Sequence, residues 1–245
     1  MPELRVESLS FKAGGTVILR DINLSFRPGE LAAVIGPSGS GKSTLIKCLT
    51  TTTKPSRGAV LVDGRDAWES RREFRQSLGY VPQDDIIHAQ LTVRQAFYYA
   101  SRLRLDTGLG AEAVKRRIDA VAALLGLAEQ RDRRIHRLSG GQRKRVNIGI
   151  ELLADPAVLV LDEPASGLDP GTEEDLVKLL ASLARAGRTV VATTHSMEYL
   201  SSFQKIVLMD SGRVAFCGGY SQLLSDFKVS HAADIFKALR GRRSP

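Results

Sequence analysis

The chain has 245 residues, a net charge of +8, 43% hydrophobic residues and 25% charged residues. This balance is typical of a globular protein of one or two domains, and it excludes a disordered or collagen-like chain. The two cysteines, Cys48 and Cys217, lie far apart in the sequence, which excludes a disulfide scaffold and a cysteine-based zinc site. We expect both to be small core residues.

The excess of basic residues favours an anionic partner, such as a nucleotide, a nucleic acid or lipid headgroups, without choosing among them. Many of the basic residues lie in the segment 131–145, and Arg240, Arg242 and Arg243 lie near the C-terminal end. No apolar run approaches the roughly 18–20 residues that cross a bilayer, and the N-terminus lacks the regions of a signal peptide. The sequence therefore predicts a cytosolic chain whose membrane role, if any, needs a partner or a further segment.

Hydrophobic patterning predicts α/β alternation that a helical block interrupts. In chain order, it predicts a hairpin over 4–26, strands over 31–35, 59–62 and 78–81 with a helix over 42–49, helices over 92–105, 111–125 and 140–153, a strand over 157–161, a helix over 171–186, and strands over 189–193 and 205–209. Continuously apolar strands suit a parallel sheet that is buried on both faces. We expect one domain over 1–245, with 1–83 and 154–245 as its α/β core and 84–153 as its helical part.

The segment Gly36–Thr44 reads GPSGSGKST and matches the pattern GxxxxGK[ST] between a predicted strand and a predicted helix. Its glycines let successive backbone N–H groups turn inward, and the helix N-terminus adds positive potential for phosphate. Lys42 is expected to bind the β- and γ-phosphates, and the Ser43 hydroxyl to ligate Mg²⁺. The predicted phosphate-binding residues are Gly36, Ser38, Gly39, Ser40, Gly41, Lys42, Ser43 and Thr44.

Polar residues follow three further predicted strands. Gln83 follows the strand over 78–81, Asp162 and Glu163 follow the strand over 157–161, and His195 follows the strand over 189–193. If these strands are parallel, their side chains meet the phosphate loop at one edge of the sheet. Adjacent strand residues point in opposite directions, so one carboxylate would serve Mg²⁺ and the other the attacking water. An apolar strand that ends in Asp resembles a Walker B segment, so we assign Asp162 to Mg²⁺ and Glu163 to the water as general base. A lone histidine is more often structural, and His195 gains functional weight only from its place at a strand end.

The segment Leu138–Gln142 reads LSGGQ and opens a predicted helix. Ser139 and Gln142 have the spacing of a capping box, which by itself is a structural explanation. Capping does not explain Gly140 and Gly141, because two glycines weaken a first helical turn. They would leave the amides of this helix end open to an anion, as in the phosphate loop.

These motifs occur in the order found in the nucleotide-binding domain of ABC transporters, which the chain resembles along nearly its whole length. The resemblance rests on the phosphate loop, Gln83, the LSGGQ segment, Val158–Pro164, Ser166–Asp169 and His195. It implies an α/β fold with a P-loop NTPase (RecA-like) core, an N-terminal antiparallel β-subdomain and an inserted α-helical subdomain. It also implies an ATPase that uses ATP and Mg²⁺.

In that family two nucleotide-binding domains dimerise head to tail, and ATP lies between the phosphate loop of one and the signature segment of the other. The resemblance implies that Ser139, Gly140, Gly141 and Gln142 contact the nucleotide held by a second domain, and that Asp169 connects the two sites. Phe11 would stack on adenine, with a plain strand-core role as the alternative. The catalytic residues would be Lys42, Gln83, Glu163 and His195, and the metal ligands Ser43, Gln83 and Asp162.

Finer features resemble the G subfamily (White type) and related bacterial exporters: Val81–Asp85, Leu91–Arg94, Arg143–Gly149 and Glu151–Leu153. Gln142 departs from this pattern, because many G-type members have Glu there, and so does the segment Thr194–Glu198. The resemblance implies an exporter at the cytoplasmic face of a membrane, with a transmembrane partner that docks near Gln83–Leu91. Ile86 and Ile87 fit such a docking surface if they are exposed, with burial in the core as an equal alternative.

Two other functions are open on the sequence. One is a non-transport ABC ATPase that acts on the ribosome or on DNA, which the positive charge permits. Such proteins carry two cassettes, long coiled coils or zinc modules, whereas this sequence has one copy of each motif, so we expect no nucleic-acid partner. The other is a nucleotide-gated binding module with little turnover, against which Glu163 argues because degenerate sites usually lose that carboxylate.

Overall fold

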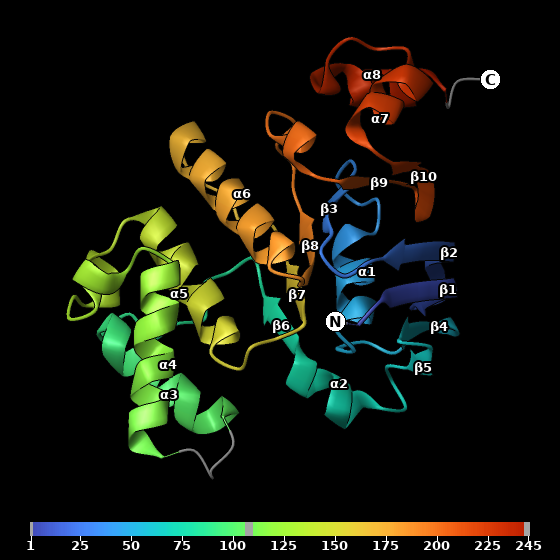
Figure 1. Cartoon of the computed structure of the whole chain (residues 1–245). Coiled ribbons are helices and arrows are strands. Elements are labelled where there is room, and N and C mark those ends of the chain that lie inside the picture. Colours follow the sequence, from blue (N-terminus) through green and yellow to red (C-terminus); the bar gives the residue numbers. More distant parts are fainter. Residues whose placement is uncertain (1, 106–109, 243–245) are drawn as a thin grey trace.

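Two β-sheets and a block of helices make up the computed structural model, which describes residues 2–105 and 110–242 (Figure 1). The elements in chain order are β1 (Leu4–Ala13), β2 (Thr16–Phe26), β3 (Leu31–Ile35), α1 (Lys42–Leu49), β4 (Arg57–Val62), β5 (Arg65–Asp66), α2 (Arg71–Ser77), β6 (Leu78–Val81), α3 (Val93–Arg104), α4 (Ala111–Leu124), α5 (Gly140–Leu152), β7 (Val158–Leu161), α6 (Pro170–Arg185), β8 (Thr189–Thr193), β9 (Lys205–Asp210), β10 (Arg213–Gly218), α7 (Tyr220–Phe227) and α8 (Ile235–Gly241). The mixed α/β fold that the sequence predicts is confirmed.

The N-terminal sheet is antiparallel, in the order β2-β1-β4-β5. Its two hairpin turns fall at Gly14-Gly15 and at Asp63-Gly64, and all four of these residues have positive φ. This conformation matches the twist of a two-residue hairpin turn. Leu4 pairs with both Phe26 and Val62, and the apolar face of this sheet packs against β3 and α1.

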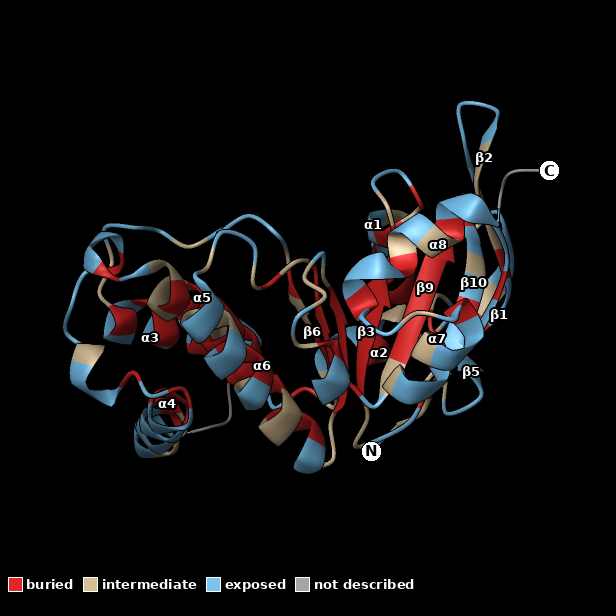
Figure 2. Cartoon of the chain, turned by 90° about the horizontal axis from the view of Figure 1, so that it is seen from above, coloured by how far each residue is buried: buried red, intermediate tan, exposed pale blue. Residues whose placement is uncertain are grey.

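The central sheet has the order β10-β9-β3-β8-β7-β6 and is parallel except for β10. Every residue of β3, β7 and β8 is buried. Alternate residues of β3 belong to two different apolar clusters: Leu31, Ala33 and Ile35 pack with α6, whereas Ala32 and Val34 pack with α1 and the antiparallel sheet. The sheet is thus covered on both faces, which explains why its strands are continuously apolar (Figure 2).

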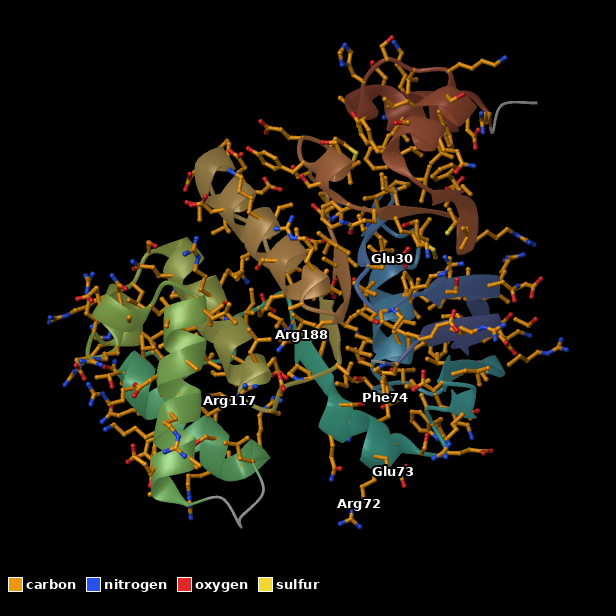
Figure 3. The ribbon with its side chains drawn as sticks, viewed as in Figure 1. Glu30, Arg72, Glu73, Phe74, Arg117 and Arg188 are labelled. Atoms are coloured by element: carbon orange, nitrogen blue, oxygen red, sulfur yellow. The ribbon has the colours of Figure 1, made fainter. Side chains whose placement is uncertain are left out.

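Helices α3, α4 and α5 lie together beyond the β6 edge of the central sheet (Figure 1). A Cβ at Gly149 would lie 2.4 Å from Cζ of Phe97, so this glycine lets α5 approach α3 closely. At the C-terminal end of α5, Arg117 of α4 donates to the carbonyls of Leu152 and Leu153. Figure 3 shows Arg117 on the side of the helices and Arg188 on the side of the sheet; both pair with the Asp155 carboxylate between α5 and β7.

An ion pair with a buried carboxylate fixes α5 to both α3 and β6. Arg104 of α3 donates two hydrogen bonds of 2.6 Å to the carboxylate of Glu151, which also accepts the Tyr80 amide at 3.1 Å. Only 6% of the Glu151 side chain is exposed. Burial raises the pKa of this carboxyl group, and Arg104 opposes that shift.

The elements expected from the sequence all form, with ends that shift by one or two residues. Helices α2, α7 and α8 and strands β5 and β10 lie outside the predicted elements, and none of them is longer than eight residues. The core prediction holds for Cys48, which is buried and whose thiol pKa rises to about 11 through burial. It is wrong for Cys217, which is exposed on the edge strand β10. Of the C-terminal arginines, Arg242 covers the Phe227 ring, and Arg243 lies outside the described residues.

The Arg104–Glu151 pair gives a stability prediction. Arg104→Met leaves a buried carboxylate without its partner and should lower the free energy of unfolding by about 2–3 kcal/mol. The matched control is Arg94→Met, which breaks an exposed pair with Asp132 and should cost less than about 1 kcal/mol. Urea unfolding of the two variants measures the difference. Equal effects would show that burial of Glu151 does not control the strength of this pair.

Candidate nucleotide-binding site

The carboxyl ends of four neighbouring parallel strands form one edge of the central sheet. Strands β3, β8, β7 and β6 are adjacent in that order and parallel. The phosphate loop follows β3, His195 follows β8, Asp162 and Glu163 follow β7, and Gln83 follows β6. The convergence that the sequence predicts is therefore present in the fold.

The phosphate loop curls in a way that only glycine permits at two positions. Gly36 has φ 154°, and a Cβ there would lie 2.4 Å from the carbonyl oxygen of Met209 and 2.7 Å from Oγ of Ser40. Gly41 has φ 99°, and its Cβ would meet Cδ2 of Leu19 at 2.7 Å. The loop is held against β9 and β2, and it ends at the N-terminus of α1, where free N–H groups favour an anion.

Lys42 lies across this loop. Its Nζ donates to the carbonyl oxygens of Gly36, at 2.8 Å, and Pro37, at 3.2 Å. Burial lowers the pKa of the Lys42 ammonium group, while the carboxylates of Glu163 and Asp162 oppose the shift. The Lys42 ammonium group is thus bound to the loop backbone and lies close enough to the carboxylates that follow β7 for them to affect its pKa.

The other residues of the phosphate loop differ in exposure. Ser38, Gly39 and Ser43 are exposed and Thr44 is half-buried, so the N-terminal turn of α1 is open to a ligand. Ser40 is 2% exposed, and its Oγ has no hydrogen-bond partner among the described residues. A buried hydroxyl without a partner costs free energy, and a polar ligand in the loop would remove that cost.

Thr193, the last residue of β8, connects the two carboxylates that follow β7. Its hydroxyl donates to Oδ1 of Asp162 at 2.6 Å and accepts the backbone amide of Glu163 at 2.7 Å. Asp162 is 7% exposed and Thr193 is fully buried. Thr193 is not among the residues predicted for the site, because a threonine at the end of a strand carries no signal until the pairing of β7 with β8 is known.

Glu163 lies between Gln83 and His195. The Gln83 amide nitrogen donates to one carboxylate oxygen at 3.2 Å, and Nε2 of His195 lies 2.5 Å from the other. Glu163 has φ 48°, a conformation that is rare for a residue with a Cβ and that clusters at functional sites. Its side chain is 15% exposed and that of His195 is 52% exposed, so the pair faces the open side of the site.

The signature segment begins α5 with the predicted capping box. The Gln142 amide donates to Oγ of Ser139 at 3.2 Å, and the Ser139 amide donates to Oε1 of Gln142 at 3.1 Å. A Cβ at Gly141 would lie only 2.2 Å from Cγ2 of Thr172, whereas at Gly140 it would meet Cδ2 of Leu168 at 3.4 Å. Gly141 thus has a packing role against α6 that the sequence did not reveal, in addition to the predicted anion role.

Asp169 caps α6 beside this segment. Its carboxylate accepts the Thr172 amide at 3.0 Å and the Thr172 hydroxyl at 2.6 Å, and these bonds lower its pKa. Helices α5 and α1 lie on opposite sides of β6 in both views (Figures 1 and 2). Within the described residues, no hydrogen bond joins Ser139–Gln142 to the phosphate loop. A single chain therefore does not bring its two predicted phosphate-binding segments together.

Three further predicted residues, Phe11, Ile86 and Ile87, lie outside this edge and differ in burial. Phe11 is half-buried on β1 and packs against the cluster beneath the antiparallel sheet, so adenine stacking and a core role both stay open. Ile86 is 73% exposed, whereas Ile87 is partly buried against the main core. Ile86 thus has the exposure expected of a docking surface, whereas Ile87 has the partial burial expected of the core.

Thr193 gives a prediction about catalysis. Thr193→Val removes the hydroxyl that orients Asp162 and Glu163, and it should lower the rate of ATP hydrolysis roughly 10- to 100-fold, the usual effect of losing a supporting partner. The control is Thr189→Val at the other end of β8, where an equally buried hydroxyl donates to the Pro2 carbonyl. Steady-state phosphate release compares the variants. Similar rates for both would contradict the role of Thr193.

Within residues 2–105 and 110–242, no helix is both long enough and apolar enough to cross a bilayer.

The ABC transporter family model matches residues 19–166, more than half of the chain. The chain is 40% identical over 92% of its length to the ABC transporter ATP-binding/permease protein Rv1747 of Mycobacterium tuberculosis, of which it covers 26%. It thus spans about a quarter of that protein. G-family transporters of plants and mammals are also among its relatives.

The chain is 37% identical over 92% of its length to the cobalt import ATP-binding protein CbiO of Rhodobacter capsulatus, of which it covers 81%. The structure of cbiO1 from Clostridium perfringens, part of the ABC transporter complex cbiONQ, superposes with a TM-score of 0.84 and 31% identity, over 91% of this chain and 90% of that one. These similarities confirm the predicted P-loop ATPase fold. The chain therefore belongs to the ABC transporter family, whose ATP-binding ATPase domain it forms.

Proposed function

We propose that this chain is the motor of an ABC exporter, which binds Mg²⁺-ATP, pairs head to tail with a second such domain and drives a transmembrane partner from the cytoplasmic face. The observation that carries the proposal is the convergence of Lys42, Gln83, Asp162, Glu163 and His195 at one sheet edge. Phosphoryl transfer needs positioning and charge neutralisation, which these groups can supply. The direction of transport rests on the resemblance to G-type exporters, because the relatives also include importers.

The residues around the loop suit a magnesium nucleotide. Ser43, Asp162 and Gln83 offer hydroxyl, carboxylate and amide oxygens, the donor set that Mg²⁺ prefers. The amide nitrogen of Gln83 is used by Glu163, so its oxygen is the end available to a metal. Bound Mg²⁺ would neutralise charge on the β- and γ-phosphates. Lys42 would leave the loop carbonyls for the phosphates, and Ser40 would gain a partner.

Glu163 is the proposed general base. Its carboxylate is held by Gln83 and His195, and its backbone is held by Thr193. A water placed in line with the γ-phosphate would lose a proton to Glu163 as its oxygen attacks phosphorus. His195 holds one oxygen of this carboxylate and is the more exposed of the two residues, where it would contact the γ-phosphate of bound ATP.

The separation of α5 from α1 supports a composite site. Since Ser139–Gln142 do not reach the phosphate loop of their own chain, they are available to the nucleotide of a second domain. The Ser139 oxygen accepts the Gln142 amide and keeps its own hydrogen to donate to a phosphate. Thr172 packs against Gly141 and donates its hydroxyl to Asp169. Asp169 is therefore close to the signature segment and beside the proposed interface.

The segment 84–91 supports docking of a transmembrane partner. Backbone bonds from Ile135 to Leu91 and from His136 to Ala89 hold its end in place, while Ile86 projects into solvent. An open groove between α3 and α4 has two tyrosines and more cations than carboxylates in its lining: Tyr98, Tyr99, Arg94, Arg102, Lys115 and Arg131, with Asp119. Tyrosine and arginine are the residues that dominate protein interfaces, and the charge suits an acidic helix of the partner.

Mixing two inactive variants tests the composite site. Lys42→Ala removes the phosphate contact within a chain, and Ser139→Arg blocks the contact to the neighbour's nucleotide, so each alone should lose nearly all hydrolysis. A mixture should recover part of the wild-type rate, because a mixed dimer holds one site with both Lys42 and Ser139 intact. Lys47→Ala, on the exposed face of α1, is the control and should keep full activity. No recovery in a mixture that still dimerises would contradict the head-to-tail arrangement.

Glu163→Gln should bind ATP as tightly as the wild type and lose at least about 100-fold in turnover, since the amide cannot take the proton. Glu198→Gln, an exposed residue close to His195, should keep wild-type turnover. Fluorescent-nucleotide titration and phosphate release measure the two quantities. Turnover within a few-fold of the wild type would place the base elsewhere.

Ile86→Asp tests the docking surface in the complete transporter. The substitution should leave ATP binding unchanged and reduce the fraction of this domain recovered with the transmembrane partner. Lys12→Asp, on an exposed part of β1, is the control. Equal recovery of both variants would move the docking surface away from this segment.

A further inference from the structure

Asp85, two residues after Gln83, binds three side chains of the signature helix α5. Its Oδ1 accepts Nδ2 of Asn147 at 2.5 Å and lies 3.2 Å from Nζ of Lys144, while Oδ2 lies 3.7 Å from Nε of Arg143. Residues 143, 144 and 147 share one face of the helix, because residues three and four apart are neighbours there. We call Asp85, Arg143, Lys144 and Asn147 the Asp85 cluster.

Lys144 also holds the backbone of Gln83. Its Nζ donates to the Gln83 carbonyl oxygen at 2.6 Å, so one ammonium group joins Gln83 and Asp85 to α5. Lys144 is 7% exposed. A buried ammonium group needs its partners, because desolvation without them is costly. The segment after β6 is therefore fixed to α5 at this point by charge as well as by hydrogen bonds.

The side chain of Gln83 points to the other half of the molecule, where its amide donates to Glu163. Gln83 is thus bound to α5 through its carbonyl oxygen and to the proposed general base through its side chain. The same helix begins at Gly140 and carries the capped signature segment at its N-terminus. Lys144 and Asp85 therefore connect Gln83 to the helix that carries Ser139 at its N-terminus.

An open hollow of about 300 Å³ lies between the Asp85 cluster and the segment 166–168, while the first turn of α5 packs against Thr172 of α6. At the other end of the helix, Glu151 ties α5 to β6. Gln83, Asp85, Gly140 and Lys144 line this hollow. The Asp85 cluster is thus the charged contact that sets the position of the N-terminal half of α5.

We propose that Asp85 and Lys144 are positioning residues that couple the two ATP sites of the dimer. ATP in one site moves Gln83, and the Asp85 cluster passes that movement to the signature segment, which serves the nucleotide held by the second domain. The coupling rests on the proposed head-to-tail function. It makes hydrolysis cooperative in ATP, because occupation of one site improves the geometry of the other.

The experiment measures hydrolysis by the full chain as a function of ATP concentration, and nucleotide affinity at concentrations where the chain is monomeric. The wild type should give a Hill coefficient between 1 and 2, as two coupled sites allow. Lys144→Met and Asp85→Asn should each reduce it to 1 and lower the maximal rate roughly 5- to 100-fold, the usual range of coupling between sites. Monomer affinity should stay within about twofold, because neither side chain touches the phosphate loop.

Three further variants separate coupling from damage to the fold. Lys144→Arg keeps donors for both Gln83 and Asp85 and should restore most of the cooperativity. The double variant Asp85→Asn/Lys144→Met should lose no more than either single variant, because both act through one contact. Arg145→Met changes the next residue of α5, which pairs with Asp175, and should remain cooperative.

Cooperative hydrolysis in Lys144→Met and Asp85→Asn would overturn the coupling and leave the proposed function standing, as would non-cooperative hydrolysis by the wild type. An equal loss of cooperativity in Arg145→Met would also overturn it, since the effect would then belong to the helix surface in general. A wild-type chain that hydrolyses no ATP would overturn both the coupling and the function on which it rests.

Discussion

The parallel pairing of β3, β8, β7 and β6 is the constraint on which the site depends. Each of these strands must be apolar on both faces, because helices or the antiparallel sheet cover it on each side. Polar side chains are therefore confined to the strand ends, and parallel pairing brings those ends to one edge. The bonds of Thr193 to Asp162 and to the Glu163 amide depend on the register of β7 and β8. A slip of one residue in this pairing would turn the side chains of the shifted strand to the opposite face of the sheet and break these bonds.

Helix α5 is the second organising element, because its contacts serve several parts of the molecule at once. Gly149 lets it approach Phe97, and Gly141 lets its first turn approach Thr172. Glu151 joins its C-terminal end to β6, and Lys144 joins its middle to Gln83. Glycines and buried charges reduce the intrinsic stability of a helix. Here each of them serves a contact with another element: α3, α6, β6 or, through Lys144, the Gln83 backbone.

Much of this organisation could be predicted from the sequence, since it depends on local patterns. The phosphate loop, the capping box of Ser139 and Gln142, and the apolar strand that precedes Asp162 each contain their own signal. Other features depend on pairing between distant segments. Thr193 acts only because β8 lies beside β7, and Asp85 meets Lys144 through the packing of α5. The core expectation for Cys217 follows from the usual burial of free cysteines, and the local sequence does not reveal the edge strand β10 that leaves it exposed.

The central claim is that ATP closes two of these domains around two nucleotides. The most direct measurement is the mass of the Glu163→Gln chain by light scattering, with and without Mg²⁺-ATP, because this variant should bind ATP without consuming it. The account predicts the 26.7 kDa monomer in the absence of ATP and twice that mass in its presence. A chain that binds ATP and keeps the mass of a monomer at concentrations well above those of the nucleotide titration would contradict the account.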